Sequence, residues 1–348
     1  MSKLPFISST RCFLVAVLFA GAAFGSHERS TTRFVIQVGD KYGYIDRSGR
    51  VVIPPKYALA WDFTEGLASV SLSSRPGTIG NAGFIDKTGK LVIPMRFQYA
   101  RAFSEGRAEI EVGDKWGFID RRGRFVVKPR YDQVQSFDEG LAAVDLASKW
   151  GFVDHRGREV IVPQYDLTWG FSEGLADVWR GAKCGFINRG NEVVIGFRFD
   201  ECSGFHGGPS PVRVGKKWGY INKKGDFVVP PKFESAWTFF DGLGAVELHG
   251  KWGYIEPSGK VVIAPQFADS GPFVRPIGVF REGLAAIKIG SKWGFINKKG
   301  RVVIPPRFDT AFGFSNGLAE VWDPHCTYID TSGKTIWTGN HESRSIGF

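Results

Sequence analysis

Residues 115–120 read Lys-Trp-Gly-Phe-Ile-Asp, and closely similar hexapeptides begin at residues 149, 217, 251 and 292. Degenerate copies of the central pair stand at Tyr42-Gly43, Ala82-Gly83, Cys184-Gly185 and Cys326-Thr327. Measured on the second residue of each pair, the spacings are 40, 34, 34, 34, 34, 34, 41 and 33 residues. The sequence is therefore an array of nine units with a period of 34 residues, and the two long spacings mark insertions around Ser73–Ala82 and Ser270–Val279.

Each hexapeptide has the pattern of a strand that is covered on both faces. In the copy at 115–120, Trp116 and Phe118 point to one face of the strand, and Gly117 and Ile119 point to the other. An aromatic residue fills the Phe118 position in every unit: Tyr44, Phe84, Phe118, Phe152, Phe186, Tyr220, Tyr254, Phe295 and Tyr328. We predict that these side chains are buried in successive stacked strands.

The residues after the hexapeptide predict a hairpin. Asp120-Arg121-Arg122-Gly123 combines an Asx-type residue with a glycine at the position that favours positive φ, and Asn191 replaces that glycine in one unit. The next strand ends at a proline, a connector follows, and a Glu-Gly turn leads to a strand of the type Leu-Ala-x-Val. Each unit is predicted to be a three-stranded antiparallel meander plus a connector.

The unit KWGFIDxxGxxVIxPxYDxxxxFxEGLAxV resembles the bacterial WG repeat family, and the resemblance covers the chain from Arg33 to about Gly339. Members of that family are β-rich repeats, so the resemblance implies an interaction module. It implies no substrate and supplies no catalytic residues.

Composition agrees with an all-β protein. The 348 residues include 45 Gly, 30 Phe and 11 Trp but only two Met, and 43% are hydrophobic, which excludes a disordered chain. Units of 34 residues cannot bury their own faces, so stability must come from stacking of neighbours. We expect an open β-solenoid, because propeller blades usually have four strands and about 40–50 residues. A closed, propeller-like toroid is the alternative.

One junction departs from the pattern. Residues 207–211 read Gly-Gly-Pro-Ser-Pro in place of the Glu-Gly-Leu-Ala element. Proline removes a backbone donor, so the sequence predicts an edge, a bend or a hinge there.

The N-terminal residues 1–25 are predicted to be a signal peptide. Lys3 and Arg11 precede an apolar run from Cys12 to Phe24 that is too short to span a membrane, and small residues allow cleavage near Gly25–Ser26. A retained membrane anchor is the alternative. Residues 26–32 are then a linker, 33–339 the repeat array and 340–348 a C-terminal tail. Export to the periplasm or the extracellular space is the predicted localisation.

The mature chain would hold three cysteines, Cys184, Cys202 and Cys326. Cys184 and Cys202 could form a bridge, but we expect two buried free thiols. No histidine stands at ligand spacing to a cysteine, so neither a metal nor a cofactor is predicted.

The sequence contains no catalytic motif of the hydrolase, zinc-protease or phosphate-binding type. Its recurring carboxylates lie in predicted turns. We therefore predict a protein that is not an enzyme. The alternative, an enzyme acting on an extracellular polymer, requires two non-periodic carboxylates, or a histidine with a partner, in one concave site.

Candidate ligand-binding residues are large aromatics at positions that vary between units. The first set lies in the connector, at Trp61, Trp169, Trp237 and Phe312, where other units carry Arg101, Gln135 or Ser203. The second set, Trp179 and Trp322, follows the Leu-Ala-x-Val strand. Such residues can stack on a partner, or they can pack over neighbouring connectors.

Charge also follows the repeat. Bases collect at the hairpin tips and acids at the Glu-Gly turns, which predicts a basic rim and a separate acidic rim. The mature chain has 43 bases and 35 acids, a net charge of +8. The expected partner is a protein, an anionic glycan or another envelope component; nucleic acid is not expected, and membrane contact only through an uncleaved N-terminal segment.

Overall fold

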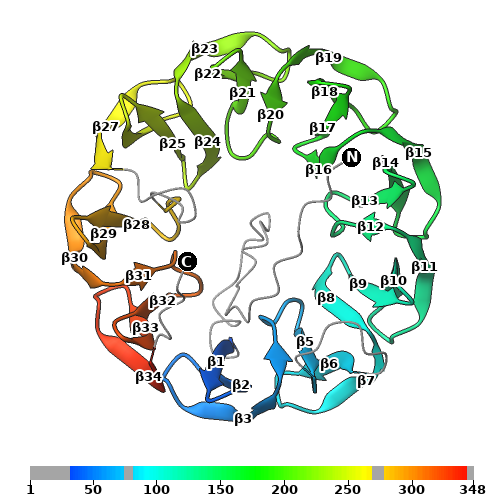
Figure 1. The fold of residues 1–348 in the computed structure, drawn as a ribbon, viewed down its shortest axis with the longest axis vertical. Helices are drawn as coiled ribbons and strands as arrows, with labels where there is room; N and C mark the ends of the chain where they lie inside the picture. The colour runs from blue at the N-terminus through cyan, green and yellow to red at the C-terminus, as the bar shows by residue number, and fades with distance from the viewer. Residues whose placement is uncertain (1–31, 74–80, 269–277, 343–348) are drawn as a thin grey trace, which may run out of the picture.

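The chain forms a closed ring of nine small antiparallel β-sheets, a nine-bladed β-propeller (Figure 1). This computed structural model describes residues 32–73, 81–268 and 278–342. The expected open solenoid is wrong, and the toroidal alternative is correct. Closure depends on contacts between the two ends of the array: Phe34 and Ile36 pack with Leu318 and Tyr328, and the Tyr328 hydroxyl donates to the Val35 carbonyl at 2.8 Å.

Strands fall into four classes by their distance from the centre of the ring. The inner strands are β4 (Leu59–Ala60), β8 (Tyr99–Ser104), β12 (Gln133–Val134), β16 (Thr168–Ser172), β20 (Glu201–Cys202), β24 (Ser235–Phe240) and β31 (Thr310–Ala311). The second strands are β1 (Phe34–Val38), β5 (Leu67–Ser71), β9 (Arg107–Val112), β13 (Leu141–Leu146), β17 (Leu175–Arg180), β21 (Ser210–Val214), β25 (Leu243–Leu248), β28 (Leu284–Ile289) and β32 (Leu318–Trp322).

The third strands carry the Trp-Gly hexapeptides, and the outer strands follow the circumference. The third strands are β2 (Lys41–Ile45), β6 (Ala82–Asp86), β10 (Lys115–Asp120), β14 (Lys149–Asp154), β18 (Lys183–Ile187), β22 (Lys217–Ile221), β26 (Lys251–Ile255), β29 (Lys292–Asn297) and β33 (His325–Asp330). The outer strands are β3 (Val51–Tyr57), β7 (Leu91–Phe97), β11 (Phe125–Tyr131), β15 (Glu159–Tyr165), β19 (Val193–Phe199), β23 (Phe227–Phe233), β27 (Val261–Ala268), β30 (Val302–Phe308) and β34 (Thr335–Glu342).

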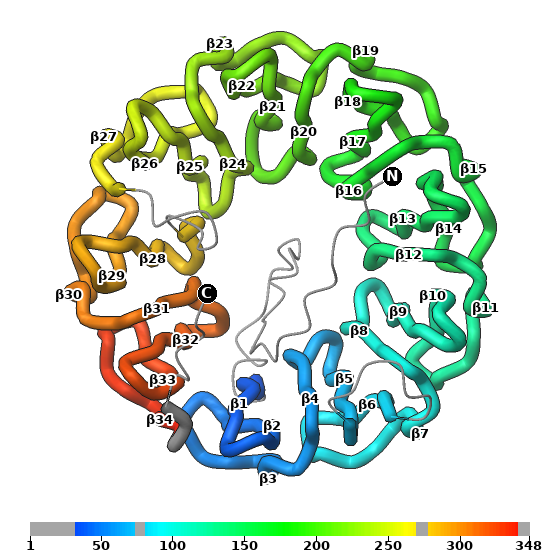
Figure 2. The backbone as a smooth tube through the Cα atoms, in the orientation of Figure 1, coloured from blue at the N-terminus to red at the C-terminus, as the bar shows by residue number. Residues whose placement is uncertain are grey.

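Blades are numbered 1 to 9 in chain order. Blade 1 is β1–β3 and blade 8 is β28–β30; each of the other seven has four strands among the described residues. The sequence predicted three strands and a connector. The fourth strand is formed by that connector, which crosses from the outer strand of one blade to form the inner strand of the next (Figure 2). Four strands fit into 34 residues because several inner strands are only two residues long.

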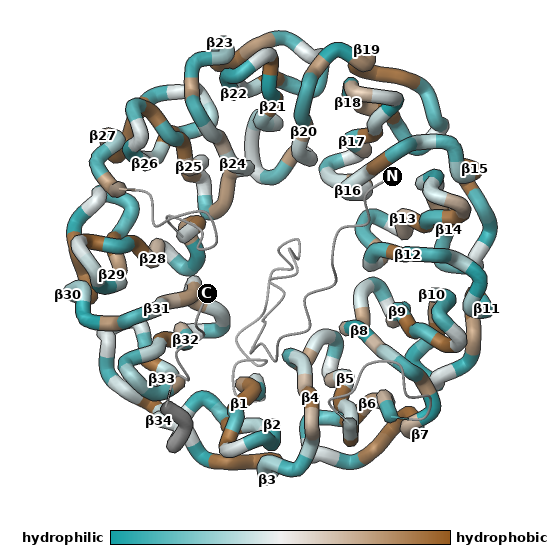
Figure 3. The backbone as a smooth tube through the Cα atoms, in the orientation of Figure 1, coloured by the Kyte–Doolittle hydropathy of each residue, from teal (hydrophilic) through white to brown (hydrophobic). Residues whose placement is uncertain are grey.

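The hydrophobic core is divided among the interfaces between blades. Nine clusters of buried side chains each join two neighbouring blades, and the ninth joins blade 9 to blade 1. Hydrophobic segments accordingly recur in every blade (Figure 3). The prediction for the nine aromatic positions is confirmed, because each of these side chains is at most 7% exposed. Stacking of neighbours therefore stabilises the array.

The glycine of each Trp-Gly pair lies under a bulge of the outer strand. Trp150 pairs with Tyr165 and Phe152 with Ile161, so the outer strand has two more residues than its partner over this interval. A Cβ on Gly151 would lie 2.6 Å from the backbone nitrogen of Pro163. Only glycine allows the two backbones to approach this closely, and proline suits the bulge because it needs no hydrogen-bond acceptor there.

The hairpin turn forms as predicted. Oδ1 of Asp120 accepts hydrogen bonds from the backbone N–H groups of Arg122 (2.9 Å) and Arg124 (3.0 Å). Asn191 takes the place of the glycine with φ of 65°.

The junction at residues 207–211 is not the predicted edge, but the chain does bend at Gly207 and Gly208; the predicted hinge stays a prediction. β21 begins at Ser210 and is an internal strand paired with both β20 and β22. The carbonyl of Pro211 accepts a hydrogen bond from the Ser203 N–H at 3.2 Å, so proline leaves this link to the inner strand in place.

The predicted signal peptide (1–25) and most of the linker lie outside the described residues, as do parts of both insertions (74–80 and 269–277). The described array begins with β1 at Phe34 and its last strand ends at Glu342.

Gly151→Ala tests the close approach of the two strands. We expect it to lower the free energy of unfolding by about 2 kcal/mol or more, because the new methyl group must displace backbone atoms. Gly196→Ala is the matched control, since a Cβ there meets no atom within 4 Å; it should change stability by no more than about 0.5 kcal/mol. Thermal and urea melts measure both. Equal effects of the two substitutions would contradict the role assigned to Gly151.

Candidate functional site

Two kinds of turn meet on one face of the ring. The Glu-Gly turn joins the inner strand to the second, and the Asx hairpin joins the third strand to the outer one. Because successive strands are antiparallel, these two turns lie at the same end of the blade.

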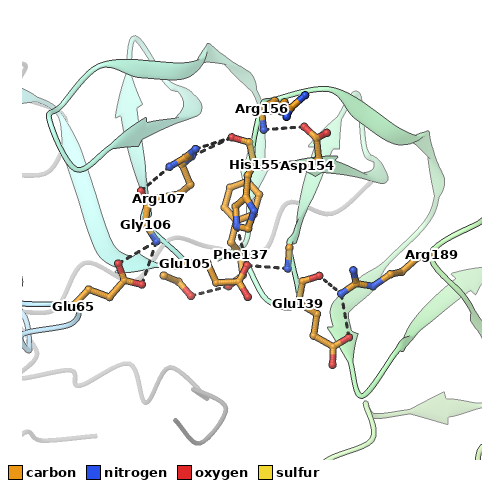
Figure 4. Close-up of polar contacts among 12 residues, drawn as sticks. Glu65, Glu105, Gly106, Arg107, Phe137, Glu139, Asp154, His155, Arg156 and Arg189 are labelled. Atoms are coloured by element: carbon orange, nitrogen blue, oxygen red, sulfur yellow. Dashed lines mark hydrogen bonds and ion pairs between the residues drawn. The ribbon is translucent and has the colours of Figure 1, made fainter. Parts of the chain in front are cut away.

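On this face the carboxylate of each Glu-Gly turn binds the next blade (Figure 4). Glu105 accepts a hydrogen bond from Gly140 N at 2.8 Å, and its Oε2 lies 2.9 Å from Nε2 of His155 at the following hairpin tip. His155 also stacks on Phe137, with ring centroids 4.7 Å apart. Pairs of the same kind are Glu65–Arg121, Glu139–Arg189, Glu173–Lys223 and Asp241–Lys298.

The prediction of separate basic and acidic rims is therefore wrong. The bases at the hairpin tips pair with the acids of the preceding blade, which lowers the charge that this face presents. Blade 6 has Gly207 at the acidic position and blade 7 has Pro257 at the basic one, so both members of that pair are missing together. The carboxylates of the turns serve assembly, as their repetition indicates.

A second set of ion pairs lies at the opposite end of the strands. Lys115 of β10 pairs with Asp132 of the following connector at 2.5 Å, and Asp132 also accepts from Ala147 N of the next blade at 2.8 Å. Equivalent pairs are Lys149–Asp166, Lys183–Asp200, Lys217–Glu234 and Lys292–Asp309.

Cys184 and Cys202 form a disulfide, so the expectation of two free thiols is wrong. Cys184 stands at the tryptophan position of β18, and Cys202 lies on β20 of the next blade. The bridge therefore links blade 5 to blade 6, because stacking places the third strand of one blade beside the inner strand of the next. Cys326 is buried and is not part of this disulfide.

The first set of candidate aromatics lies on or directly after the inner strands. Trp169 on β16 is 63% exposed, and Phe312, after β31, is 39% exposed. Trp61 is half-buried with its ring against Tyr99, and Trp237 is half-buried against Trp252. Their role in binding stays a prediction.

The polar members of this position explain why it varies. Arg101 donates to the Val134 carbonyl at 3.2 Å, and Gln135 donates to the Thr168 carbonyl at 2.9 Å. Both acceptors belong to the next inner strand, so the position makes contacts between blades. Among the aromatics of the first set, Trp169 is the most exposed.

The second set is less exposed. Trp179 is partly buried against the cluster between blades 5 and 6. Trp322 donates from Nε1 to Oε1 of Glu320 at 2.8 Å.

Sequence analysis missed three carboxylates at the x position of the Leu-Ala-x-Val strands: Glu109, Asp177 and Glu320. Glu109 is nearly completely buried; burial raises its pKa, which the nearby Arg101 lowers in part. Burial also raises the pKa of Glu320. Comparison of the repeat units could have identified these carboxylates, because other units carry Ala143, Ala245 or Ala286 at this position.

Asp177 is the most unusual of the three. It is completely buried, and burial raises the pKa of its carboxyl to about 7. Its Oδ2 accepts a hydrogen bond from Trp169 N at 3.3 Å, whereas its Oδ1 has no hydrogen-bond partner within the described residues. A carboxylate in this state favours a ligand that can donate to it.

His206 and Ser172 lie beside this carboxylate. Ser172 Oγ is 3.0 Å from His206 Nδ1, and burial lowers the pKa of His206. Ser172 Oγ also donates to the Phe205 carbonyl at 2.5 Å, just as Ser104 Oγ donates to the Phe137 carbonyl at 2.7 Å. The serine is therefore part of a recurring link between blades.

Within residues 32–73, 81–268 and 278–342, no three His, Cys, Asp or Glu side chains are grouped so that they could hold a metal ion. Nor does this part of the chain contain a helix long and apolar enough to cross a membrane.

A family model described as "WG containing repeat" matches the chain in eight consecutive segments, residues 42–74, 83–116, 116–150, 150–183, 185–218, 218–252, 252–293 and 293–321. No curated protein matches the chain.

One solved structure shares the fold at low identity, and two others are similar to the chain with lower TM-scores. The crystal structure of a eukaryotic initiation factor is 13% identical, with a TM-score of 0.60, over 88% of this chain and 95% of that one. The dihydro-heme d1 dehydrogenase NirN is 14% identical, with a TM-score of 0.48, over 92% and 75% of the two chains. BamB from Moraxella catarrhalis is 10% identical, with a TM-score of 0.39, over 77% and 92%. Identities this low show nothing about function.

Asp177→Asn tests the buried carboxyl through pH. In the unfolded chain the pKa of an aspartate is about 3.9, so the folded protein binds this proton more tightly. Ionisation of buried Asp177 therefore destabilises the folded wild-type protein. This loss of stability is absent below pH 4, grows between pH 4 and pH 7 and is constant above pH 7. The stability of the Asn variant relative to wild type should therefore rise over that interval, by roughly 2 to 4 kcal/mol.

Urea unfolding at several pH values measures this difference. Asp200→Asn is the control of opposite sign, because its ion pair with Lys183 lowers the pKa of Asp200. That variant should be less stable than wild type above pH 4, and the difference should shrink as the pH falls. A pH-independent difference for Asp177→Asn would contradict the assignment.

Proposed function

The chain belongs to the WG containing repeat family, and we propose that it is an exported, non-enzymatic scaffold that binds a protein or glycan of the bacterial envelope at the inner strands of its ring. One observation carries the proposal: Trp169 exposes 63% of its surface at a position where Arg101 and Gln135 contact the next blade. Tryptophan is enriched at the energetically important positions of binding surfaces.

The disulfide supports export. Structural disulfides persist in oxidising compartments such as the periplasm and are rare in the cytosol. The Cys184–Cys202 bridge crosses an interface between blades, where it adds to the packing. It agrees with the N-terminal segment, whose charged start and apolar run are typical of a signal peptide.

Packing contacts favour a binding role over catalysis. The Ser172–His206 contact and Asp177 resemble the arrangement expected of the rival enzyme. The Ser172 hydroxyl, however, is buried and donates to the Phe205 carbonyl. Because Ser104 makes the same bond in blade 3, the serine has a structural explanation.

Replacing Trp169 on β16 and replacing Trp237 on β24 should have different effects on the free energy of unfolding. Trp169→Ala should leave stability within about 0.5 kcal/mol of wild type, because its side chain is mostly exposed. Trp237→Ala should lower it by roughly 1 to 3 kcal/mol, because Trp237 packs against Trp252. Thermal melts measure both.

Binding of an envelope fraction to the immobilised chain measures function. Trp169→Ala should reduce binding about thirtyfold, the loss expected when an aromatic anchor worth about 2 kcal/mol is removed. Phe227→Ala on β23 is the matched control, an exposed aromatic on the circumference, and should bind as wild type does. Unchanged binding by Trp169→Ala would overturn the proposed surface.

Thiol titration tests the disulfide in protein recovered from the host. A thiol reagent in denaturant should detect two more thiols after reduction than before. Cys202→Ser should lower stability by roughly 3 kcal/mol, the value expected for a closed loop of this size. The same thiol count before and after reduction would contradict the bridge.

A further inference from the structure

Blade 3 shows how the ring satisfies a buried carboxylate at the x position. Glu109 is 2% exposed, and its Oε2 lies 2.6 Å from the Arg101 guanidinium. Its other oxygen accepts from the Ser136 hydroxyl of the next blade, also at 2.6 Å. The same guanidinium lies 4.3 Å above the Trp116 ring. The Arg101 cation and the Ser136 hydroxyl thus compensate this acid, and the Trp116 ring face stabilises the cation.

Blade 5 keeps the acid and lacks both donors. Asp177 stands at the Glu109 position, but Trp169 replaces Arg101 and Gly204 replaces Ser136. A Cβ on Gly204 would lie 3.7 Å from Oδ1 of Asp177, so this oxygen faces the glycine. The main-chain N–H of Trp169 binds the other carboxylate oxygen.

Most other blades lack the acid, and the one other acid at this position has a donor of its own, because Glu320 of blade 9 accepts from Trp322 Nε1 at 2.8 Å. Ala143, Pro211, Ala245 and Ala286 occupy the x position in blades 4, 6, 7 and 8. Ser69, in blade 2, donates to the Ala100 carbonyl at 2.8 Å. Retaining a buried carboxylate while removing its partners costs stability, and a ligand that restores the partners would offset that cost.

We propose that Asp177 and Trp169 bind the guanidinium group of an arginine side chain from a protein partner, which supplies to blade 5 what Arg101 supplies to blade 3. This inference rests on the proposed function and specifies the ligand of its surface. Asp177 is one methylene shorter than Glu109, and Gly204 faces it where Ser136 faces Glu109, so both sides of this contact are smaller than in blade 3. Trp169 is exposed and offers an aromatic face to the same cation.

Acetyl-arginine amide is the probe, and the neutral isostere acetyl-citrulline amide is its control. Isothermal titration and tryptophan fluorescence of the full chain measure binding. Arginine should bind saturably and at least about tenfold more tightly than citrulline, because only the cation forms a charge-assisted bond to the carboxylate. Equal binding of the two probes, or no saturable binding, would overturn the proposal.

Variants locate the site. Asp177→Asn and Trp169→Ala should each weaken arginine binding at least about tenfold. Gly204→Ser should also weaken it, because its hydroxyl can donate to Oδ1 as Ser136 does to Glu109; the new Cβ would lie 3.2 Å from His206 Nε2, so a thermal melt must show that this variant folds. Arg101→Ala is the positive control, since it should create a second arginine site at Glu109. Wild-type affinity in Asp177→Asn and Gly204→Ser would overturn the proposal.

The envelope fraction separates this inference from the proposed function. If Trp169→Ala abolishes binding of the fraction and Asp177→Asn and Gly204→Ser do not, the proposed surface stands and the arginine ligand is wrong. If none of the variants changes binding, both are wrong. Binding of a chitin oligosaccharide that needs Trp169 but not Asp177 would assign the surface to glycans and overturn the arginine ligand.

Discussion

The approach of two backbones at each Trp-Gly pair determines the geometry of the ring. Because Gly151 has no Cβ, the outer strand β15 can bulge over it and turn along the circumference. The chain then reaches the next blade within a short connector, which becomes the inner strand there. A larger residue at Gly151 would hold β15 away from the third strand β14, because its Cβ would overlap the backbone of the outer strand. The burial of the aromatic positions and both sets of ion pairs depend on the stacking of neighbouring blades.

The sequence contained most of the local structure of a blade and little of its global geometry. The aromatic positions, the Asx hairpin and the tolerance of Asn191 follow from side-chain chemistry, and all three are confirmed. Closure depends on the angle at which blades pack, which a repeat pattern does not encode. The prediction of separate basic and acidic rims could have been avoided. Two turns separated by two antiparallel strands must lie at the same end of a blade, so the acidic and basic residues had to meet.

The candidate site was only partly visible in the sequence. Variation between units identified Trp169, but it could not distinguish this exposed ring from Trp237, whose neighbour Trp252 lies on another strand. Asp177 stands where other units carry alanine, so comparison of the units predicts an unusual carboxylate there, but not that it is buried without a cation. Departures from the repeat gather where blades 5 and 6 meet, with the disulfide, Asp177 and His206. A regular scaffold makes such departures conspicuous, because each has its regular counterpart elsewhere in the ring.

The contact between Tyr328 and Val35 joins residues 293 positions apart, and in the described residues no strand of blade 9 belongs to the sheet of blade 1. Every other interface brings together blades that are neighbours in sequence, so it can form as soon as two adjacent units have been synthesised. The interface between blades 9 and 1 can form only after the whole array has been synthesised, and closing it costs the loop entropy of almost the entire chain. We therefore expect folding to be local and sequential until the last step, and the interface between blades 9 and 1 to open first when stability is lost.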